Sequence, residues 1–152
     1  MVGAGWRPAI RNYMKKKLKT NFKIWDTIFA NRIHCYIGYS GDELSKLLER
    51  QYKYNEPVSI NGFGGLSFDM ERIEVSADEK IGDTVYIVFV IWLRRYNWTI
   101  DDMATLIHEI SHTIDKMFDY NNIPLSKDTG EFRAVLAGNI YGKIAQKIRN
   151  LL

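Results

Sequence analysis

The sequence predicts an α+β fold, because its segments show two different hydrophobic patterns. Apolar side chains recur at three- and four-residue spacing between residues 99 and 118, which is typical of an amphipathic helix. Residues 84–93 instead form a nearly continuous apolar run, which indicates a strand buried on both faces. The chain has 152 residues and is 46% hydrophobic, so we expect one domain over residues 1–152.

Local signals near the start of the chain predict a helix and then a hairpin. Pro8 favours a first helix over about residues 9–19. Residues 22–29 and 33–39 are rich in β-branched and aromatic side chains, and a plausible turn at residues 30–32 separates them. We therefore expect these two segments to pair as antiparallel strands.

The middle of the chain predicts a short helix and two short strands. The helix covers about residues 43–52 and is capped by Ser40 or Asp42. Residues 61–65 are rich in glycine and indicate a flexible break or a flap above a cleft. The two short strands, 66–70 and 73–76, follow this break.

Capping signals frame two long helices in the last third of the chain. Thr99 and Asp102 resemble a capping box at the start of the first helix, which should end near Phe118. A polar residue at position 128 or 129 should cap the last helix, which covers about residues 130–150.

Positive charge is concentrated at the N-terminal end. The chain has a net charge of +3, whereas residues 7–23 contain seven Lys and Arg and no acid, so the remainder is negative. We interpret this segment as the solvated face of a helix within residues 1–23, either part of the domain or an appendage. The alternative is a contact surface for nucleic acid or an acidic partner, because Trp6, Tyr13 and Phe22 are interspersed with the cations.

Composition and the absence of targeting patterns predict a cytoplasmic protein without membrane association. A single cysteine excludes a disulfide framework within the chain and suits a reducing compartment. The longest apolar run, residues 85–93, is too short to cross a bilayer as a helix. Neither a secretory signal nor a myristoylation pattern is present at the N-terminus.

Residues 108–112 carry the chemistry, because they form an H-E-x-x-H motif. His108 and His112 are one helical turn apart on the same face, so their imidazoles can meet one metal ion. Both lie nearly opposite the centre of the apolar stripe of their helix. Glu109 is placed to take a proton from a water that Zn²⁺ has made more acidic.

A catalytic zinc site needs a third protein ligand and an open position. Glu131 is the first choice, because it begins the last helix and a loop of about a dozen residues would let that helix fold back antiparallel to the first. Small residues along the last helix would permit close approach between the two helices. These residues are Ala134, Gly138, Gly142 and Ala145.

Two other side chains are weaker alternatives for the third ligand. Asp119 lies about 10 Å along the helix axis from His112, which is too far for one ion. His34 lies on a predicted strand, where a packed or hydrogen-bonded role is more common. Asp115 is three residues from His112, where it is either a solvated carboxylate or an acceptor for the second ring nitrogen of that histidine.

The combination of His108, Glu109 and His112 with Glu131-x-x-Ala134 resembles the zincin metallopeptidases that use a glutamate ligand, the gluzincins. More particularly, it resembles the very small H-E-x-x-H proteins encoded by phages and prophages. The resemblance implies a zincin-like fold. In that fold a small twisted sheet packs on an active-site helix and on a C-terminal helix that bears a ligand.

The resemblance also implies roles for individual residues. His108, His112 and Glu131 become ligands of Zn²⁺, and Glu109 becomes the general base. The larger gluzincins often have a further histidine that stabilises the oxyanion, but no histidine follows His112 in this chain. Candidates for that role are Tyr141, Tyr120 and Arg133.

We therefore expect a zinc-dependent metallopeptidase that hydrolyses a peptide or protein substrate with a metal-activated water. If the chain is phage-encoded, its location would be the host cytoplasm. The alternative is a non-catalytic, zinc-containing phage protein that binds a host protein or nucleic acid through its basic N-terminal segment.

Overall fold

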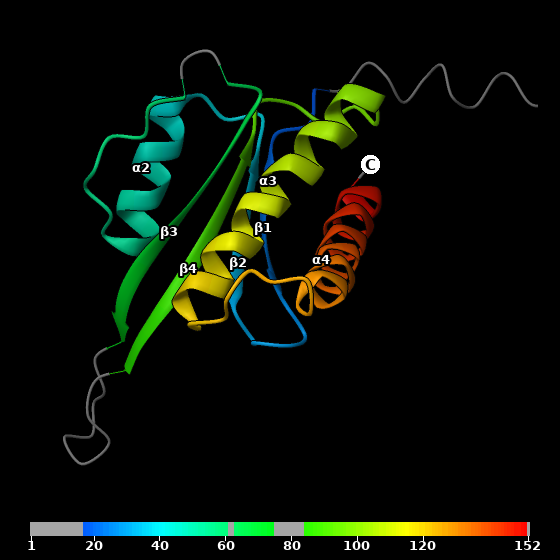
Figure 1. Cartoon of the computed structure of the whole chain (residues 1–152). Helices are drawn as coiled ribbons and strands as arrows, with labels where there is room; N and C mark the ends of the chain where they lie inside the picture. The colour runs from blue at the N-terminus through cyan, green and yellow to red at the C-terminus, as the bar shows by residue number, and fades with distance from the viewer. Residues whose placement is uncertain (1–16, 61–62, 75–83, 152) are drawn as a thin grey trace, which may run out of the picture.

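The computed structural model describes residues 17–60, 63–74 and 84–151 (Figure 1). Most of the helix predicted over residues 9–19 therefore lies outside the described residues, as do Trp6 and Tyr13. The last three residues of that prediction, 17–19, are not helical, because the chain there already leads into the first strand.

Within the described residues, four strands form one mixed sheet in the order β1-β2-β4-β3. The strands β1 and β2 form the predicted antiparallel hairpin, β2 and β4 are parallel, and β4 and β3 are antiparallel. Together with the three helices of the described part of the chain, this sheet confirms the predicted α+β class. The strands are β1 (Thr20–Trp25), β2 (Arg32–Ile37), β3 (Gly65–Glu74) and β4 (Thr84–Leu93).

The first strand is shorter than predicted because Asp26 turns the chain. The buried carboxylate of Asp26 accepts the backbone N–H groups of Ile28, Phe29 and Asn31, at 2.9, 2.6 and 2.7 Å. An aspartate that hydrogen-bonds to nearby backbone N–H groups replaces strand pairing with a turn. The loop between the strands therefore runs from Asp26 to Asn31 and is wider than the turn predicted at residues 30–32.

The prediction of two short strands within residues 66–76 is wrong, since β3 is one continuous strand. It pairs with β4 along its whole length, from Gly65 opposite Leu93 to Glu74 opposite Thr84. The bounds of β4 match the predicted strand, 84–93. A long, regular partner of this kind keeps β3 extended through residues whose own sequence is ambiguous.

Helices cover both faces of the sheet (Figure 1). On one face, α2 (Gly41–Tyr52) packs Leu44 and Leu48 into a core cluster that contains Trp92. On the other face, α3 (Ile100–Tyr120) and α4 (Gly130–Leu151) share a second cluster with the inward side chains of β2 and β4. Among the described residues, no helix has both the length and the apolar character that crossing a membrane requires.

The predicted capping box is present on α3, and Ser40, one of the two predicted caps of α2, forms a capping box there as well. The hydroxyl of Ser40 accepts the N–H of Glu43, whose carboxylate accepts the N–H of Ser40. Thr99 and Asp102 make the same exchange at the start of α3. These boxes fix where both helices begin, and α3 in turn fixes the orientation of the H-E-x-x-H motif.

Candidate metal site

The α3 helix presents its two histidines to solvent. Its apolar stripe, which includes Ile110, Ile114 and Met117, is buried in the core, so the opposite side of the helix is exposed. His108 and His112 lie on that side with their Nε2 atoms 3.0 Å apart. The structure therefore brings these two predicted ligands together.

The separation of the two nitrogens is compatible with one shared metal ion. Two nitrogens that each bind Zn²⁺ at about 2.0–2.1 Å in tetrahedral geometry are about 3.3 Å apart. The Nε2 atoms of His108 and His112 are 3.0 Å apart, and their rings lie edge to face. This pair of donors fits two positions of a zinc site.

Glu109 lies between α3 and the start of β3. Its side chain is buried although its neighbour His108 is exposed. A Cβ atom added to Gly65 would come within 2.8 Å of Cγ and 3.0 Å of Oε1 of Glu109, and within 2.9 Å of Cγ2 of Thr105. The glycine at position 65 therefore gives the Glu109 side chain room between β3 and α3.

Sequence reasoning missed the role of Gly65. The glycine-rich run 61–65 was a visible signal, but it predicted only a break or a flap. Gly65 is in fact the first residue of β3, and its backbone lies against α3. Residues 61–62 of the run lie outside the described residues.

The third predicted ligand, Glu131, is exposed in the first turn of α4. Within the part of the chain that the structure describes, no group of three or more His, Cys, Asp and Glu side chains is close enough to hold a metal ion. The structure thus joins His108 to His112 but does not bring Glu131 to them, and Glu131 as a ligand remains a prediction. Asp119, the weaker alternative, is exposed near the end of α3.

Asp115 and Arg133 form an ion pair that joins α3 to α4. The guanidinium of Arg133 also lies 5.8 Å from the centre of the Phe118 ring. The observed partner of Asp115 is thus Arg133, not the ring nitrogen of His112. Arg133, a predicted oxyanion group, is held by this carboxylate near the C-terminal end of α3.

The two tyrosines predicted as oxyanion groups lie in different surroundings. Tyr141 is partly buried on α4 and packs against the core cluster, whereas Tyr120 is half exposed at the end of α3. Burial, and next the Tyr141 hydroxyl, raise the pKa of Tyr96 in that cluster. Tyr141 therefore packs on the core that α3 and α4 share with the sheet.

His34 is a structural residue of the sheet, in agreement with its predicted packed and hydrogen-bonded role. Its Nδ1 lies 2.8 Å from the Tyr52 hydroxyl and 2.9 Å from the Tyr36 hydroxyl, and its Nε2 lies 3.1 Å from Oδ1 of Asn21. Burial, and next the charge of Lys23, lower the pKa of His34 to about 3. Both ring nitrogens have partners, so His34 is not placed to bind a metal.

Small residues on α4 do not make the close helix approach expected of them. The core side of this helix carries Leu136, Ile140 and Ile144, and a Cβ atom added to Gly138 or Gly142 would have no heavy atom within 4 Å. These glycines face a shallow cavity between α4 and β1. They therefore do not help to bring Glu131 toward α3.

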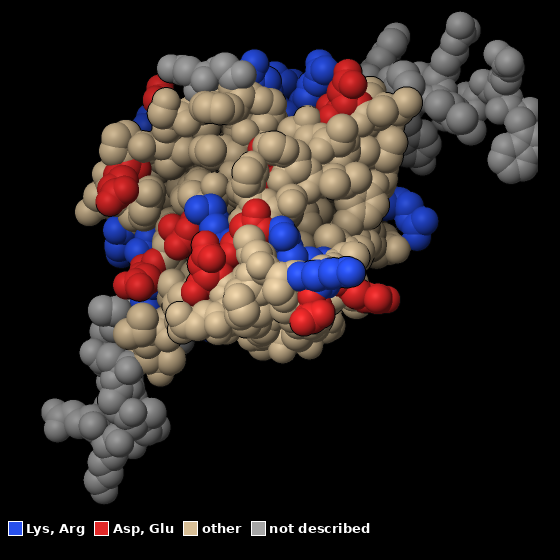
Figure 2. Space-filling view, in the orientation of Figure 1, with Lys and Arg blue, Asp and Glu red and all other residues tan. Residues whose placement is uncertain are grey.

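Charged side chains of both signs surround α3 and the edge strand β3. Lys116 of α3 lies 3.3 Å from Asp69 of β3, and the Asp115–Arg133 pair is close by along the same helix. Figure 2 shows acidic and basic side chains interspersed on this face. The ion pair between Lys116 and Asp69 helps to hold α3 along the outer strand of the described sheet.

The described end of the basic segment packs on the domain. Lys19 pairs with Glu43 and lies 5.3 Å from the centre of the Tyr39 ring, and Lys23 lies 5.5 Å from the centre of the Tyr52 ring. Phe22 is partly buried against the core. In this part of the predicted contact surface, residues 17–19 lead into β1 and residues 20–23 belong to it. Residues 17–23 therefore do not form the expected helical face.

Comparisons of the chain with protein-family models, with curated proteins and with solved structures find no match. The chemistry of the site therefore follows from its own residues.

Proposed function

We propose that this protein is a zinc-dependent hydrolase, and specifically a metallopeptidase of the gluzincin type. The observation that carries the proposal is the arrangement on α3. Two imidazoles converge at 3.0 Å on an exposed helix face, and Glu109, the residue after His108, has a buried side chain. A solvated histidine pair needs no such carboxylate, whereas hydrolysis requires a base next to the water.

His108 and His112 would hold the metal through Nε2, with Glu131 as the proposed third ligand. When bound, Zn²⁺ polarises a substrate carbonyl and lowers the pKa of water. A movement of the first turn of α4 toward α3 would be needed to bring Glu131 to the histidines, since it is exposed and apart from them.

Glu109 would act as the general base and later as the general acid. Its carboxylate would accept a proton from the attacking water and pass it to the leaving amine. Packing against Gly65 restricts the positions that this side chain can adopt. When a base is already held in one position, little further conformational entropy is lost as the substrate binds.

The edge strand β3 supports a peptide as the substrate. β3 is the outer strand of the described sheet, beside the helix that carries the motif. An outer strand offers unpaired backbone N–H and C=O groups to an extended peptide. A peptide paired with β3 near Gly65 would lie next to Glu109.

The test is the change Glu109→Gln in the zinc-loaded protein. The variant should keep one zinc per chain and cleave a mixed peptide library about 10²–10⁴ times more slowly than the natural protein, as seen by mass spectrometry. The change Glu49→Gln, an exposed position on α2, is the matched control and should leave the rate unchanged. A non-catalytic zinc protein would cleave nothing while it keeps its metal, and that result would reject the enzyme.

A further inference from the structure

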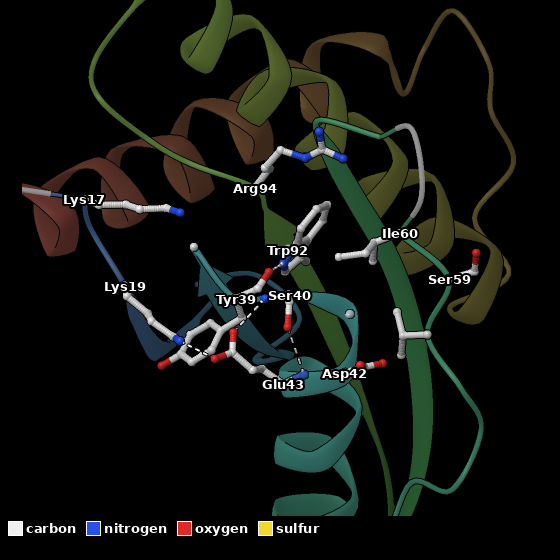
Figure 3. Close-up of a pocket in the computed structure, with 13 residues that line it drawn as sticks. Lys17, Lys19, Tyr39, Ser40, Asp42, Glu43, Ser59, Ile60, Trp92 and Arg94 are labelled. Atoms are coloured by element: carbon white, nitrogen blue, oxygen red, sulfur yellow. Dashed lines mark hydrogen bonds and ion pairs between the residues drawn. The ribbon is translucent and has the colours of Figure 1, made fainter.

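A cavity of about 770 Å³ lies at the carboxyl ends of the parallel strands β2 and β4 (Figure 3), and neither His108 nor His112 lines it. From β2 the chain continues to α2 on one face of the sheet, and from β4 it continues to α3 on the other (Figure 1). When two neighbouring parallel strands lead to helices on opposite faces of the sheet, a crevice forms at the carboxyl ends of the strands. Ligands commonly bind in such a crevice. The volume is in the range of small-molecule sites.

Two glycines, Gly38 in the loop between β2 and α2 and Gly41 at the first position of α2, shape this cavity. Gly38 has a φ of +80°, and a Cβ atom there would be 2.3 Å from the backbone oxygen of Leu18. The segment that carries Lys17 and Lys19 can therefore cross this loop closely. A Cβ atom on Gly41 would be 3.1 Å from Cγ1 of Ile60, so that the chain on the opposite wall also approaches closely.

The floor of the cavity is a rigid aromatic surface. Trp92 is 1% exposed and donates its indole N–H to the backbone oxygen of Tyr39 at 2.9 Å. Figure 3 shows Trp92 between Arg94 and the start of α2. Because the Trp92 side chain is already ordered before a ligand binds, binding costs less entropy.

The walls carry more cations than are needed to balance their carboxylates. Lys19 pairs with Glu43, and this lysine is the main cause of a pKa near 2 for that carboxyl, so the two charges cancel. The rest of the lining has two cations, Lys17 and Arg94, and one acid, Asp42. The positive end of the α2 dipole adds to the two cations.

Arg94 is the most informative of these cations. Its backbone N–H donates to the carbonyl of Gly64 at 2.9 Å, which fixes where its side chain begins. Across the described ranges, its guanidinium has no hydrogen-bond or ion-pair partner, and Figure 3 shows it above Trp92. A guanidinium presents donors in a planar fork that matches the oxygens of a phosphate group.

We propose that this cavity binds a small molecule with a diphosphate group. Arg94 and Lys17 would contact the phosphate oxygens, next to the first turn of α2. The diphosphate could belong to free pyrophosphate or to a nucleoside diphosphate. This site is separate from the histidines and does not depend on the proposed peptidase activity.

The test is isothermal titration of the full chain with inorganic pyrophosphate and, separately, with ADP. Arg94→Gln should weaken binding of both probes about ten- to hundredfold, the loss expected for a charged hydrogen bond. Arg50→Gln removes the same charge from the exposed far end of α2 and should leave the affinity unchanged. Tighter binding of ADP than of pyrophosphate would identify a nucleotide, and equal binding would identify the free diphosphate.

Three results would overturn the proposal. The first is no binding of either probe, and the second is equal weakening by Arg94→Gln and Arg50→Gln. The third is loss of binding in the double variant His108→Ala/His112→Ala, which would place the phosphate on a metal at α3. Retained binding in that double variant, together with no peptide cleavage by the zinc-loaded natural protein, would leave the cavity established and the proposed peptidase rejected. In the first of these cases, binding of a single-stranded oligonucleotide would indicate a nucleic-acid surface in place of the diphosphate site.

Discussion

The three histidines of this chain occupy two regions with opposite properties. His34 lies inside the sheet, where hydroxyl and amide groups satisfy both of its ring nitrogens and burial lowers its pKa to about 3. His108 and His112 lie on the exposed face of α3, and each has the other as its ring-nitrogen partner. A histidine whose hydrogen bonds are complete stabilises a fold, whereas two that point at one position have room for a ligand between them.

The largest expected effect is on zinc affinity, which should fall when His108 is changed and stay the same when His34 is changed. His108→Ala removes one of two converging donors, so we expect zinc to bind more than about a hundredfold more weakly in equilibrium dialysis. His34→Gln should keep the zinc affinity of the natural protein and lower the free energy of unfolding by about 1–3 kcal/mol, because it disturbs buried hydrogen bonds. If His34→Gln lost zinc and His108→Ala kept it, the assignment of the two regions would be reversed.

The second prediction concerns the glycine that makes room for Glu109. Gly65→Ala would put a methyl group 2.8 Å from Cγ of Glu109, which should lower the free energy of unfolding by about 1–3 kcal/mol and reduce hydrolysis. Gly64→Ala is the matched control, since its methyl group would meet only Thr105, at an ordinary 3.7 Å. Urea unfolding and peptide cleavage measure the two effects. Equal behaviour of the two variants would show that the Gly65 contact does not position the carboxylate.

The smallest expected effect is a pH dependence that belongs to His34. Burial and Lys23 lower its pKa to about 3, whereas an unfolded histidine titrates near 6.5. Between these values the unfolded chain holds a proton that the folded chain lacks, so stability falls as the pH decreases. The limiting slope for one such group is about 1.4 kcal/mol per pH unit.

Urea unfolding at pH 7.5 and pH 5 measures this slope. The natural protein should lose roughly 2 kcal/mol more than His34→Gln over that interval. An equal loss in both proteins would show that His34 is not the buried, neutral group described here.

The parts of the fold that the sequence predicts well are those with local causes. The bounds of β4 follow from one apolar run, the start of α3 follows from its capping box, and the start of α2 follows to within two residues from a cap residue. The shared face of His108 and His112 follows from the helical repeat alone.

The parts that sequence reasoning misses depend on contacts between distant segments. β3 is continuous because β4 pairs with all of it, and the close contact of Gly65 with Glu109 exists only after β3 and α3 have packed. The partner of Asp115 is likewise Arg133, 18 residues away on another helix. Neither periodicity nor motif spacing contains such information.

The measurement that tests the central claim most directly is anomalous diffraction at the zinc edge from crystals of the zinc-loaded protein. We predict one peak per chain, within about 2.0–2.1 Å of Nε2 of both His108 and His112, with a carboxylate oxygen of Glu131 as the third protein ligand. A peak bound to other residues, or no peak in protein that has been incubated with zinc, would contradict the metal site on α3.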